Sequence, residues 1–542
     1  MLVSLKTVDL DNCDQEPIRS PGSIQPHGVL MVVDLNGVLT HVSANAVAVI
    51  PHIPALGQRL ALEQLARDDA LQETMEVMAV MLEDARSGDA IDPIATTAKI
   101  GDVDFDVVLH ARACQVLVEF EPSTGTITDQ RSTSVTAQRG IGRLKKLNSV
   151  EALLTDVVQS VRQLTGFDRV MAYRFFGDGS GEIMAESKVE TLTPFLHRRF
   201  PASDIPSQAR HLYLINTLRL IANVHDVQVP LHSSAPTTPP LDLSQSILRS
   251  VSPIHIEYLK NINVTASMSI SIVVGGKLWG LIACHHRAAH RVPFAVRRAC
   301  DVMAQVLATS IALVLEKSAN ARREAALALR SKLVDLGDQG EEAAANFGPS
   351  QSAVAEVIAH DSMVFAHGND LVHEGLPRDA ALALVHWLEL QHEPLVHRDS
   401  LSSLPEQLCA DLSPFCGFLA MRHDHVNKGW TILLRREQAM DITWSGPPDK
   451  VARIGPLGAR LTPDGSLAEW QEAVRGRAMP WDEMDLALAQ LVLDEVTRTT
   501  AARARDIELA RAHLLAILGH DLRTPLQTIS AVAALLAPGL AT

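Results

Sequence analysis

The sequence predicts a multidomain α+β protein with antiparallel sheets, long connecting helices and a helical C-terminal segment. Three observations support this fold class. The chain has 542 residues, more than a single hydrophobic core usually organises. Its 47% hydrophobic and 20% charged residues are typical of globular domains. Runs that alternate as strands do recur between stretches with helical periodicity.

The first domain begins with a hairpin signal. Two β-rich runs, 29–34 and 38–43, flank Leu35-Asn36-Gly37, and an Asn-Gly pair between such runs favours a tight turn. Helical sequence over about 60–86 and further strands to Phe120 complete a compact α+β unit. The Ser/Thr-rich stretch 128–139 is expected to be a linker.

Helical periodicity and a second hairpin define the next domains. The stretch 141–164 carries apolar residues on one face and predicts a helix, and Gly275-Gly276 separates two strands, 268–274 and 278–284. A long helix is expected from Phe294 to about Asp335, where Gly and Pro are absent. The predicted divisions are an arm (1–27), a first domain (28–125), a linker (126–140), a second domain (141–315), a third domain (316–497) and a helical end (498–542).

Composition argues against several classes of protein. The net charge of −15 and the lack of a long basic run disfavour nucleic-acid binding. The apolar run 302–315 reaches only ~21 Å as a helix, short of a ~30 Å bilayer core, so we expect a buried interface helix and no membrane span. The N-terminus does not resemble a signal peptide, which predicts a cytoplasmic protein. Six scattered cysteines predict neither a metal site nor a disulfide framework.

One stretch, 200–210, organises a candidate binding site. It contains Asp204 between apolar neighbours, and two arginines and two histidines follow downstream. Taken singly, Asp204 is a common turn residue, arginines are usually on the surface, and a lone histidine is more often a core residue than a ligand. The combination is more specific, because Cys13 also stands on a polar, accessible arm.

These residues together resemble the bacterial phytochromes, red/far-red photoreceptors built from PAS, GAF and PHY domains. The motif Pro201-Ala202-Ser203-Asp204-Ile205-Pro206 is complete, and the resemblance covers nearly the whole chain. It implies that the first domain is PAS, the second is a bilin-binding GAF domain and the third is PHY. It also implies that the N-terminal arm threads through a loop of the GAF domain.

The resemblance implies a covalent pigment, biliverdin IXα, joined by a thioether to Cys13. Plant and cyanobacterial phytochromes use a cysteine just before the pocket histidine, but that position is Ile254 here. In the family, matches of Arg219 and Arg249 hold a propionate, and the match of Asp204 contacts the pyrrole nitrogens. The other residues expected to line the pigment are Met171, Tyr173, Phe195, Phe200, Ile205, Pro206, Tyr213, Ser252, His255, Tyr258, Ser267, Ser269 and His285.

The PHY domain of phytochromes carries a hairpin, the tongue, which is expected at about 430–475. Trp444-Ser445-Gly446 matches its first signature, but the second reads Pro463-Asp464-Gly465-Ser466-Leu467. The family has Arg where Asp464 stands, and that Arg pairs with the match of Asp204. An aspartate turns this attraction into repulsion, so we expect the ion pair to be absent, with Arg453 or Arg460 substituting or one photostate weakened.

The C-terminal stretch His520-Asp521-Leu522-Arg523-Thr524-Pro525-Leu526 resembles the phosphoacceptor box of sensor histidine kinases. The resemblance makes His520 the phosphoacceptor and Asp521 a possible base, in a homodimer that signals to a response regulator. No ATP-binding domain follows in these 542 residues, so the chain alone is expected to be inactive as a kinase.

Two alternatives stay open. One is a bilin-binding protein with a degenerate photocycle or a non-kinase output, and the discriminating residue is Asp464. The other is a pigment-free PAS/GAF ligand sensor, for which Cys13 would be dispensable.

The substitution Asp464→Arg is expected to restore the tongue ion pair and to slow reversion of the photoproduct in darkness. Absorption recorded after illumination measures that rate. An unchanged rate would count against a role for Asp464.

Overall fold

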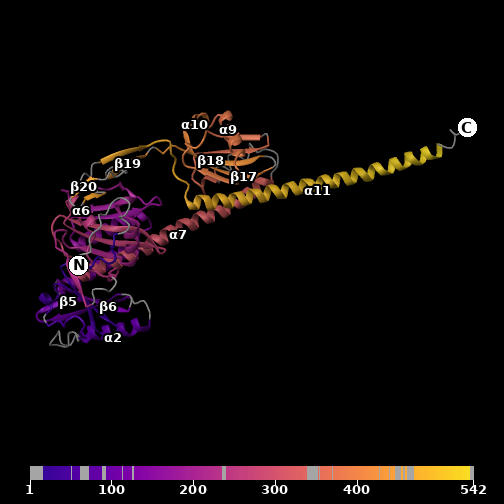
Figure 1. Cartoon of the computed structure of the whole chain (residues 1–542). Helices are drawn as coiled ribbons and strands as arrows, with labels where there is room; N and C mark the ends of the chain where they lie inside the picture. Colours follow the sequence, from indigo (N-terminus) through magenta and orange to yellow (C-terminus); the bar gives the residue numbers. More distant parts are fainter. Residues whose placement is uncertain are drawn as a thin grey trace. The chain divides into compact units, whose positions relative to one another are not determined.

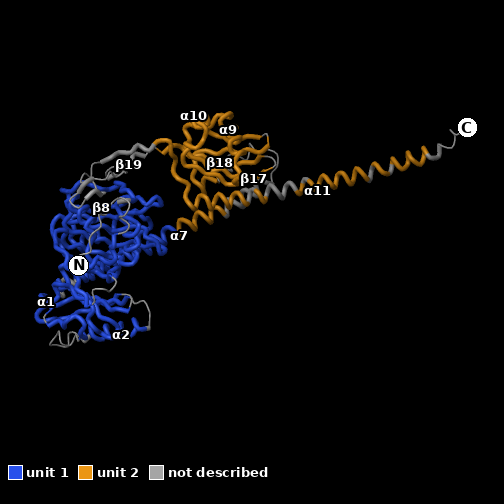
Figure 2. The backbone as a smooth tube through the Cα atoms, in the orientation of Figure 1, with its two compact units in different colours: residues 1–315, 442–472 blue, residues 316–441, 473–542 orange. Residues whose placement is uncertain are grey.

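A computed structural model describes residues 16–50, 52–60, 72–87, 93–112, 114–124, 127–234, 240–338, 352, 354–368, 370–425, 428–438, 440–445, 453–455, 458–460 and 469–536. The chain forms two compact units (Figure 2). Unit 1 contains residues 1–315 and 442–472, and unit 2 contains residues 316–441 and 473–542.

The first sheet of unit 1 follows the predicted strand pattern. The hairpin of β2 and β3 forms as expected, and the Asp34 carboxylate accepts hydrogen bonds from the backbone N–H of Asn36 (2.8 Å) and Val38 (2.9 Å) in the turn. The short helix α1 (Ala46–Val49) and α2 (Gln72–Ser87) contribute to its core. The sheet order is β1 (Ser23–Ile24), β11 (Val229–Ser233), β3 (Leu39–Ser43), β2 (Val29–Asp34), β6 (Gln115–Pro122), β5 (Val103–Arg112) and β4 (Ile94–Ile100).

The N-terminal segment 17–25 is held from two sides by one stretch of the second domain. On one side β1 pairs with β11, which itself joins the first sheet through β3. On the other side lies the segment 243–250. Its Leu243 N donates to Arg19 O (2.7 Å), and its Leu248 O accepts from Gln25 N (2.8 Å). The arm thus lies between 229–231 and 243–250, which agrees with the threading that the family resemblance implies.

The second sheet of unit 1 is backed by helices α3 (Ile127–Leu144), α4 (Val150–Thr165) and the first part of α7 (Phe294–Asp338). The Ser149 side chain caps α4 by accepting from Ala152 N (3.2 Å). The strand order is β10 (Leu218–Ile221), β12 (Ala266–Val274), β13 (Lys277–His286), β7 (Arg169–Phe175), β8 (Gly181–Lys188), β9 (Arg198–Phe200), β19 (Met440–Ser445) and β22 (Glu469–Val474).

Two details of this region correct the sequence predictions. The stretch 128–139, expected to be a linker, lies within helix α3. The single helix expected over 141–164 is divided, because α3 ends at Leu144 and the Ser149 cap starts α4. The polar composition that suggested a linker instead fits a helix of which only part faces the core, through Ala137, Ile141 and Leu144.

Part of α7, Phe294–Ala326, is the one helix among the described residues that is long and apolar enough to cross a membrane. Its positions Val296, Cys300, Met303, Leu307 and Ile311 recur at three and four residues and are buried in the core of unit 1. One face of the helix is thus buried, in part as the sequence analysis expected for 302–315, but Val302, Leu313 and Leu315 of that run are exposed.

The tongue segment extends the second sheet. Strand β19 pairs with β9 in parallel, with Thr443 opposite Arg198 and Trp444 opposite Arg199, and β22 lies beside β19. A small hairpin, β20 (Arg453–Gly455) and β21 (Gly458–Arg460), lies between them in sequence. The expected start near 430 is wrong, because 429–436 is strand β18 of the third domain. Pro463, Asp464 and Ser466 fall outside the described residues, so the loss of the ion pair with Asp204 stays a prediction.

Unit 2 is built on a five-stranded antiparallel sheet (Figure 1). Helices α9 (Arg378–Glu389) and α10 (Glu406–Asp411) pack in one core, which includes Phe418 and Trp430. A separate core contains Ala326 of α7 together with Leu488 and Val492 of α11 (Glu483–Leu536). The order is β15 (Asp370–His373), β14 (Ser362–His367), β18 (Gly429–Arg436), β17 (Phe415–Asp424) and β16 (Leu395–Arg398).

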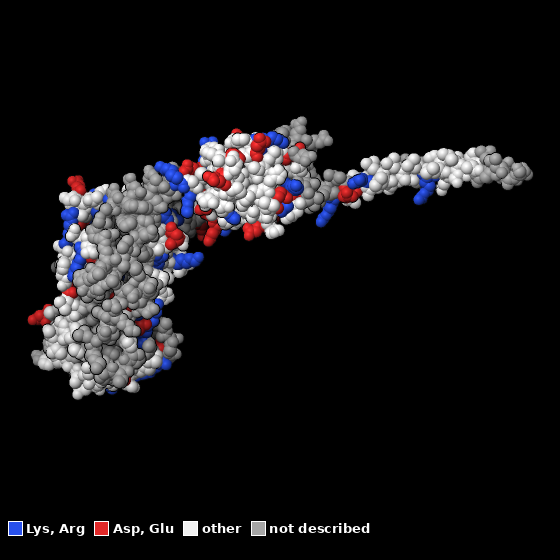
Figure 3. Space-filling view, turned by 45° about the horizontal axis from the view of Figure 1, so that its top comes forward, with Lys and Arg blue, Asp and Glu red and all other residues white. Residues whose placement is uncertain are grey.

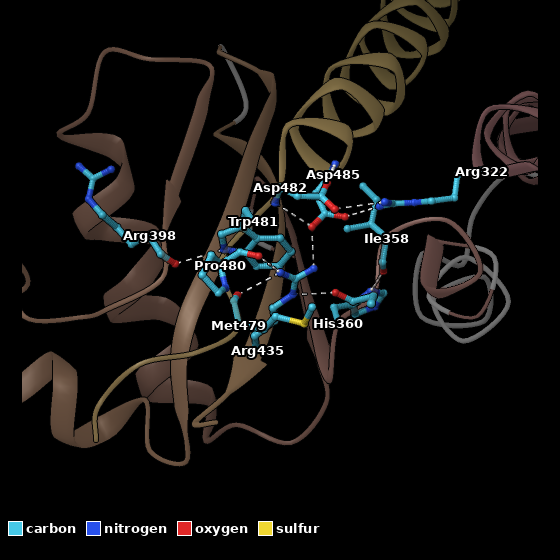
Figure 4. Close-up of polar contacts among 11 residues, drawn as sticks. Arg322, Ile358, His360, Arg398, Arg435, Met479, Pro480, Trp481, Asp482 and Asp485 are labelled. Atoms are coloured by element: carbon cyan, nitrogen blue, oxygen red, sulfur yellow. Dashed lines mark hydrogen bonds and ion pairs between the residues drawn. The ribbon is translucent and has the colours of Figure 1, made fainter. Parts of the chain in front are cut away.

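A buried ionic cluster fixes the first turn of α11 (Figure 4). Arg435 of β18 binds the Asp485 carboxylate (2.9 Å) and donates to the carbonyls of Met479 (3.0 Å) and Pro480 (2.8 Å), while its guanidinium lies 3.7 Å from the Trp481 ring centroid. Arg322 of α7 pairs with the other oxygen of Asp485. The start of α11 is therefore tied at once to the sheet and to α7.

Candidate functional site

One cavity of about 270 Å³ in unit 1 collects the candidate residues, although they are spread over more than a hundred positions in the sequence. Helices α5 (Ser207–Ile215) and α6 (Pro253–Asn261), strands of the second sheet, and residues Glu16 and Ile18 of the arm line it. Cys13 lies outside the described residues. All the other residues predicted for the pigment pocket line this cavity: Met171, Tyr173, Phe195, Phe200, Asp204, Ile205, Pro206, Tyr213, Arg219, Arg249, Ser252, His255, Tyr258, Ser267, Ser269 and His285.

Aromatic rings form an apolar wall of the cavity. The Tyr173 and Phe200 ring centroids lie 6.0 Å apart, and those of Phe195 and Phe200 lie 6.5 Å apart. A Cβ atom at Gly181 would stand 2.1 Å from the Tyr173 ring, so only glycine leaves room for it there. The Tyr173 hydroxyl is buried without a partner among the described residues, and burial raises its pKa. Such a wall suits a flat, largely apolar ligand.

Two buried guanidinium groups give the cavity its positive charge. Arg219 donates to the backbone carbonyls of Arg249 and Ser250 (2.8 Å for the latter), and Arg249 donates to Ile18 O (2.6 Å). Burial lowers the pKa of both groups, to about 10 for Arg249, and Arg249 adds to the effect on Arg219. Both nevertheless stay charged at neutral pH because a guanidinium is so strongly basic.

Neither guanidinium is fully satisfied within the described part of the chain. Nη1 of Arg219 and Nε of Arg249 are buried without an acceptor there. A buried charge that lacks a partner is costly, so groups of this kind usually meet an anion. The pair can therefore bind a carboxylate or phosphate with charge-assisted hydrogen bonds.

The two histidines of the site are neutral. Burial lowers the pKa of His255 to about 4, with a further effect from Arg219, and lowers that of His285 to about 3. The His255 ring stacks on Tyr258 with centroids 6.0 Å apart, and the Nδ1 atom of His285 is buried without a described partner. Neutral rings can donate or accept one hydrogen bond to a ligand without adding charge.

The stretch around Asp204 forms a tight turn against α5. Residues Ala202–Asp204 make one 3₁₀ turn, in which Asp204 N donates to Pro201 O (3.0 Å). Arg210 of α5 holds this turn by donating to Ile205 O (2.8 Å) and to Gly179 O (2.6 Å). Asp204 also takes part in a further interaction, so this residue is not without a partner.

The cavity includes residues that sequence reasoning missed. Glu16 and Ile18 of the arm line it, and the Ser252 hydroxyl donates to Glu16 Oε2 (2.8 Å). Their closeness to Cys13 in the sequence was the available signal. Asn216 and Gln208 also line it, and nothing in their sequence context distinguishes them from ordinary helix-end residues.

The predicted phosphoacceptor residues are not part of this cavity. His520 and Asp521 lie on α11 in unit 2, and the structure describes only their backbone. Trp444 of the tongue is likewise described only by its backbone, in strand β19.

Comparisons with known proteins agree with this architecture. Family models for a PAS fold, a GAF domain and a phytochrome region match residues 13–123, 149–315 and 326–505. A bacteriophytochrome of Pseudomonas aeruginosa is 38% identical, over 99% of this chain and 73% of that protein. The chain belongs to the bacteriophytochromes. It is a phytochrome light photoreceptor, and phytochromes bind a bilin chromophore.

Other phytochromes support the same assignment. Cyanobacterial phytochrome B of a Nostoc species is 32% identical over 96% of this chain and 72% of that protein. A bacteriophytochrome crystal structure from R. palustris matches with a TM-score of 0.75 and 32% identity, covering 91% of this bacteriophytochrome and all of that chain. The photosensory core module of a Stigmatella aurantiaca phytochrome matches with a TM-score of 0.74 and 33% identity, covering 92% and 99% of the two chains.

The rings of His255 and His285 are expected to stay neutral down to about pH 5, because burial disfavours their protonated forms. In the unfolded chain they would bind protons below their ordinary pKa near 6.5. Lowering the pH from 6.5 towards 4 therefore favours the unfolded chain, and the free energy of unfolding falls. Nuclear magnetic resonance of labelled imidazoles tests this, and protonation of both rings at pH 5.5 would contradict it.

Proposed function

We propose that this photoreceptor carries biliverdin in the cavity described above, joined to Cys13 by a thioether. The observation that carries the proposal is the pair of buried guanidinium groups, Arg219 and Arg249, each with an N–H that lacks an acceptor among the described residues. Biliverdin presents two propionate carboxylates on a flat, conjugated, apolar body. The carboxylates would bind the two arginines, and the pigment plane would pack against the aromatic wall.

The position of the arm supports attachment at Cys13. Glu16 lines the cavity and accepts a hydrogen bond from Ser252, and Cys13 precedes it by three residues in the sequence. Three extended residues span at most about 11 Å, which keeps Cys13 within reach of a pigment there. The Cys13 sulfur would add to a vinyl carbon and the thiol proton would pass to the other vinyl carbon, so no oxidant is needed.

A pigment-free ligand sensor is the weaker alternative. In such a sensor the aromatic wall and the two incompletely hydrogen-bonded guanidinium groups would have to bind some other flat dianion. A photoreceptor with a degenerate photocycle differs from the main proposal only after the pigment is bound, and Asp464 in the tongue is the residue on which that difference turns.

Adding biliverdin to the purified chain is expected to give a covalent adduct whose absorption shifts reversibly under red and far-red light. Cys13→Ala should still bind the pigment but release it on denaturation, because the propionate contacts do not involve the thiol. Absorption spectra and pigment fluorescence after denaturing electrophoresis measure both properties. Pigment without a stable far-red form would favour the degenerate photocycle, and no bound pigment would refute the proposal.

The output is proposed to be a cytoplasmic histidine-kinase signal, with His520 as the phosphoacceptor for a response regulator. The support is the His520–Leu526 sequence and its place on a long helix. Leu515, Leu518, Leu522, Leu526 and Ile529 are between 55% and 64% exposed and recur at three and four residues. This apolar stripe favours pairing with the same helix of a second copy.

The charge distribution agrees with such pairing. Between Arg511 and Ala533, Arg523 is the one Lys, Arg, Asp or Glu whose side chain the structure describes, and Figure 3 shows this length of α11 as mostly white. The double substitution Leu518→Glu and Leu522→Glu is expected to weaken the homodimer because it places charges in the stripe. Analytical ultracentrifugation measures the mass, and the control is His513→Glu, which places a charge on the opposite face of α11 from the stripe. A dimer as tight as the wild type would refute α11 pairing.

A further inference from the structure

Glu119 of the first domain is a buried carboxylate that none of the roles described above uses. It lies on β6, opposite Leu30 of β2 and Val108 of β5, and its side chain is fully buried. Around it the buried side chains of Leu30, Leu117, Leu243 and Leu248 form an apolar layer between the sheet and the segment 241–248. Burial raises the pKa of Glu119 to about 7, so the ionised carboxylate depends on hydrogen-bond donors that offset this effect.

These donors come from three consecutive residues of the second domain. Glu119 Oε2 accepts hydrogen bonds from Ser246 Oγ (2.8 Å) and Leu248 N (2.8 Å), and Oε1 accepts one from Ile247 N (3.2 Å). The nearest ionisable neighbour is His110, whose Nδ1 atom lies 3.5 Å from Oε1 and whose pKa is lowered to about 4 by burial. The side chains of Glu119 and His110 are both fully buried, so water does not replace a hydrogen bond to Glu119 that is lost.

Arg249 directly follows Leu248, the last of the three residues that donate to Glu119, and its side chain lines the cavity. The Arg249 backbone carbonyl accepts from Arg219, and Ser250 N donates to Ser23 O (3.2 Å). Gly28 allows the layer to close, because a Cβ there would stand 2.6 Å from the Leu248 side chain. The Glu119 bonds therefore fix the backbone immediately before Arg249, at the place where its side chain enters the pocket.

We propose that Glu119 is a positioning residue for Arg249, so that a residue of the PAS domain sets how tightly the bilin pocket of the GAF domain holds a propionate. The inference rests on the proposed biliverdin site. A guanidinium binds a carboxylate best in a narrow range of geometry, and the loss of backbone anchors one residue away widens that range. Glu119 itself is not among the residues that line the cavity, although its charge also acts on Arg219.

The test compares biliverdin with its dimethyl ester, in which both propionates are neutral. Binding is titrated by absorbance in a full-length Cys13→Ala background, where it is expected to stay reversible. The ratio of the two dissociation constants isolates the carboxylate contacts, and Arg249→Ala gives the ratio without this arginine. Ester binding alone reports whether the pocket is folded.

Glu119→Met keeps the side-chain volume but removes both acceptor oxygens and with them all three hydrogen bonds. It is expected to weaken biliverdin binding about tenfold or more while ester affinity changes little, because buried donors left unsatisfied loosen the backbone before Arg249. Ser246→Ala removes one of the three bonds and should give a loss of about threefold in the same direction. In combination with Arg249→Ala, neither change should have a further effect on the ratio.

Arg112→Gln is the matched control. It breaks the partly exposed ion pair with Asp242 (2.8 Å), another attachment of the same segment, and it leaves in place Asp242, whose charge acts on Arg249. It should change the ratio less than about twofold. An unchanged ratio in both Glu119→Met and Ser246→Ala would overturn the inference, and so would an equal loss for pigment and ester. If Glu119→Met fails to fold, the ratio in Ser246→Ala decides. A wild type that binds neither compound refutes the proposed pigment site, and the inference falls with it.

Discussion

The position of residues 17–25 between 229–231 and 243–250 is the constraint on which the rest of unit 1 depends. Strand β11 belongs to the second domain but completes the sheet of the first, and Leu248 and Ser250 hold the arm from the other side. The same short stretch carries Arg249 into the cavity. A pigment anchored on the arm and held by Arg249 would therefore be bound by two segments that also hold each other.

The cavity itself is shaped by what its charged groups need. Arg219 and Arg249 satisfy part of their hydrogen-bonding capacity on backbone carbonyls, which makes burial of two like charges tolerable without cancelling them. The histidines beside them are kept neutral by the same burial. The site thus combines fixed positive charge with neutral, adaptable donors and acceptors, and it lies against a wall of aromatic rings.

Sequence reasoning was strongest where local rules act alone. The hairpin at Asn36-Gly37 and the apolar face of α4 followed from turn chemistry and periodicity, and the pocket residues followed from family motifs. It was weaker where distant segments decide. The Ser/Thr-rich stretch 128–139 is part of helix α3 because one side of it packs against a core. Strand β18 was assigned to the tongue because its own residues do not indicate that it pairs with β14 and β17. Glu119 looked like any strand carboxylate, since its three donors come from more than a hundred residues away.

The ionic cluster at the start of α11 has a mechanical consequence. Asp485 accepts from Arg435 of the sheet and from Arg322 of α7, and Asp482 and Asp485 cap each other's backbone. The helix then runs on without interruption past His520, 35 residues beyond Asp485. At ~1.5 Å per residue this length is about 52 Å, so a tilt of about 5° at the first turn moves the backbone of His520 by about 5 Å. A small change at the Asp485 carboxylate, where the sheet and α7 both hold α11, would thus become a displacement of several ångströms at His520.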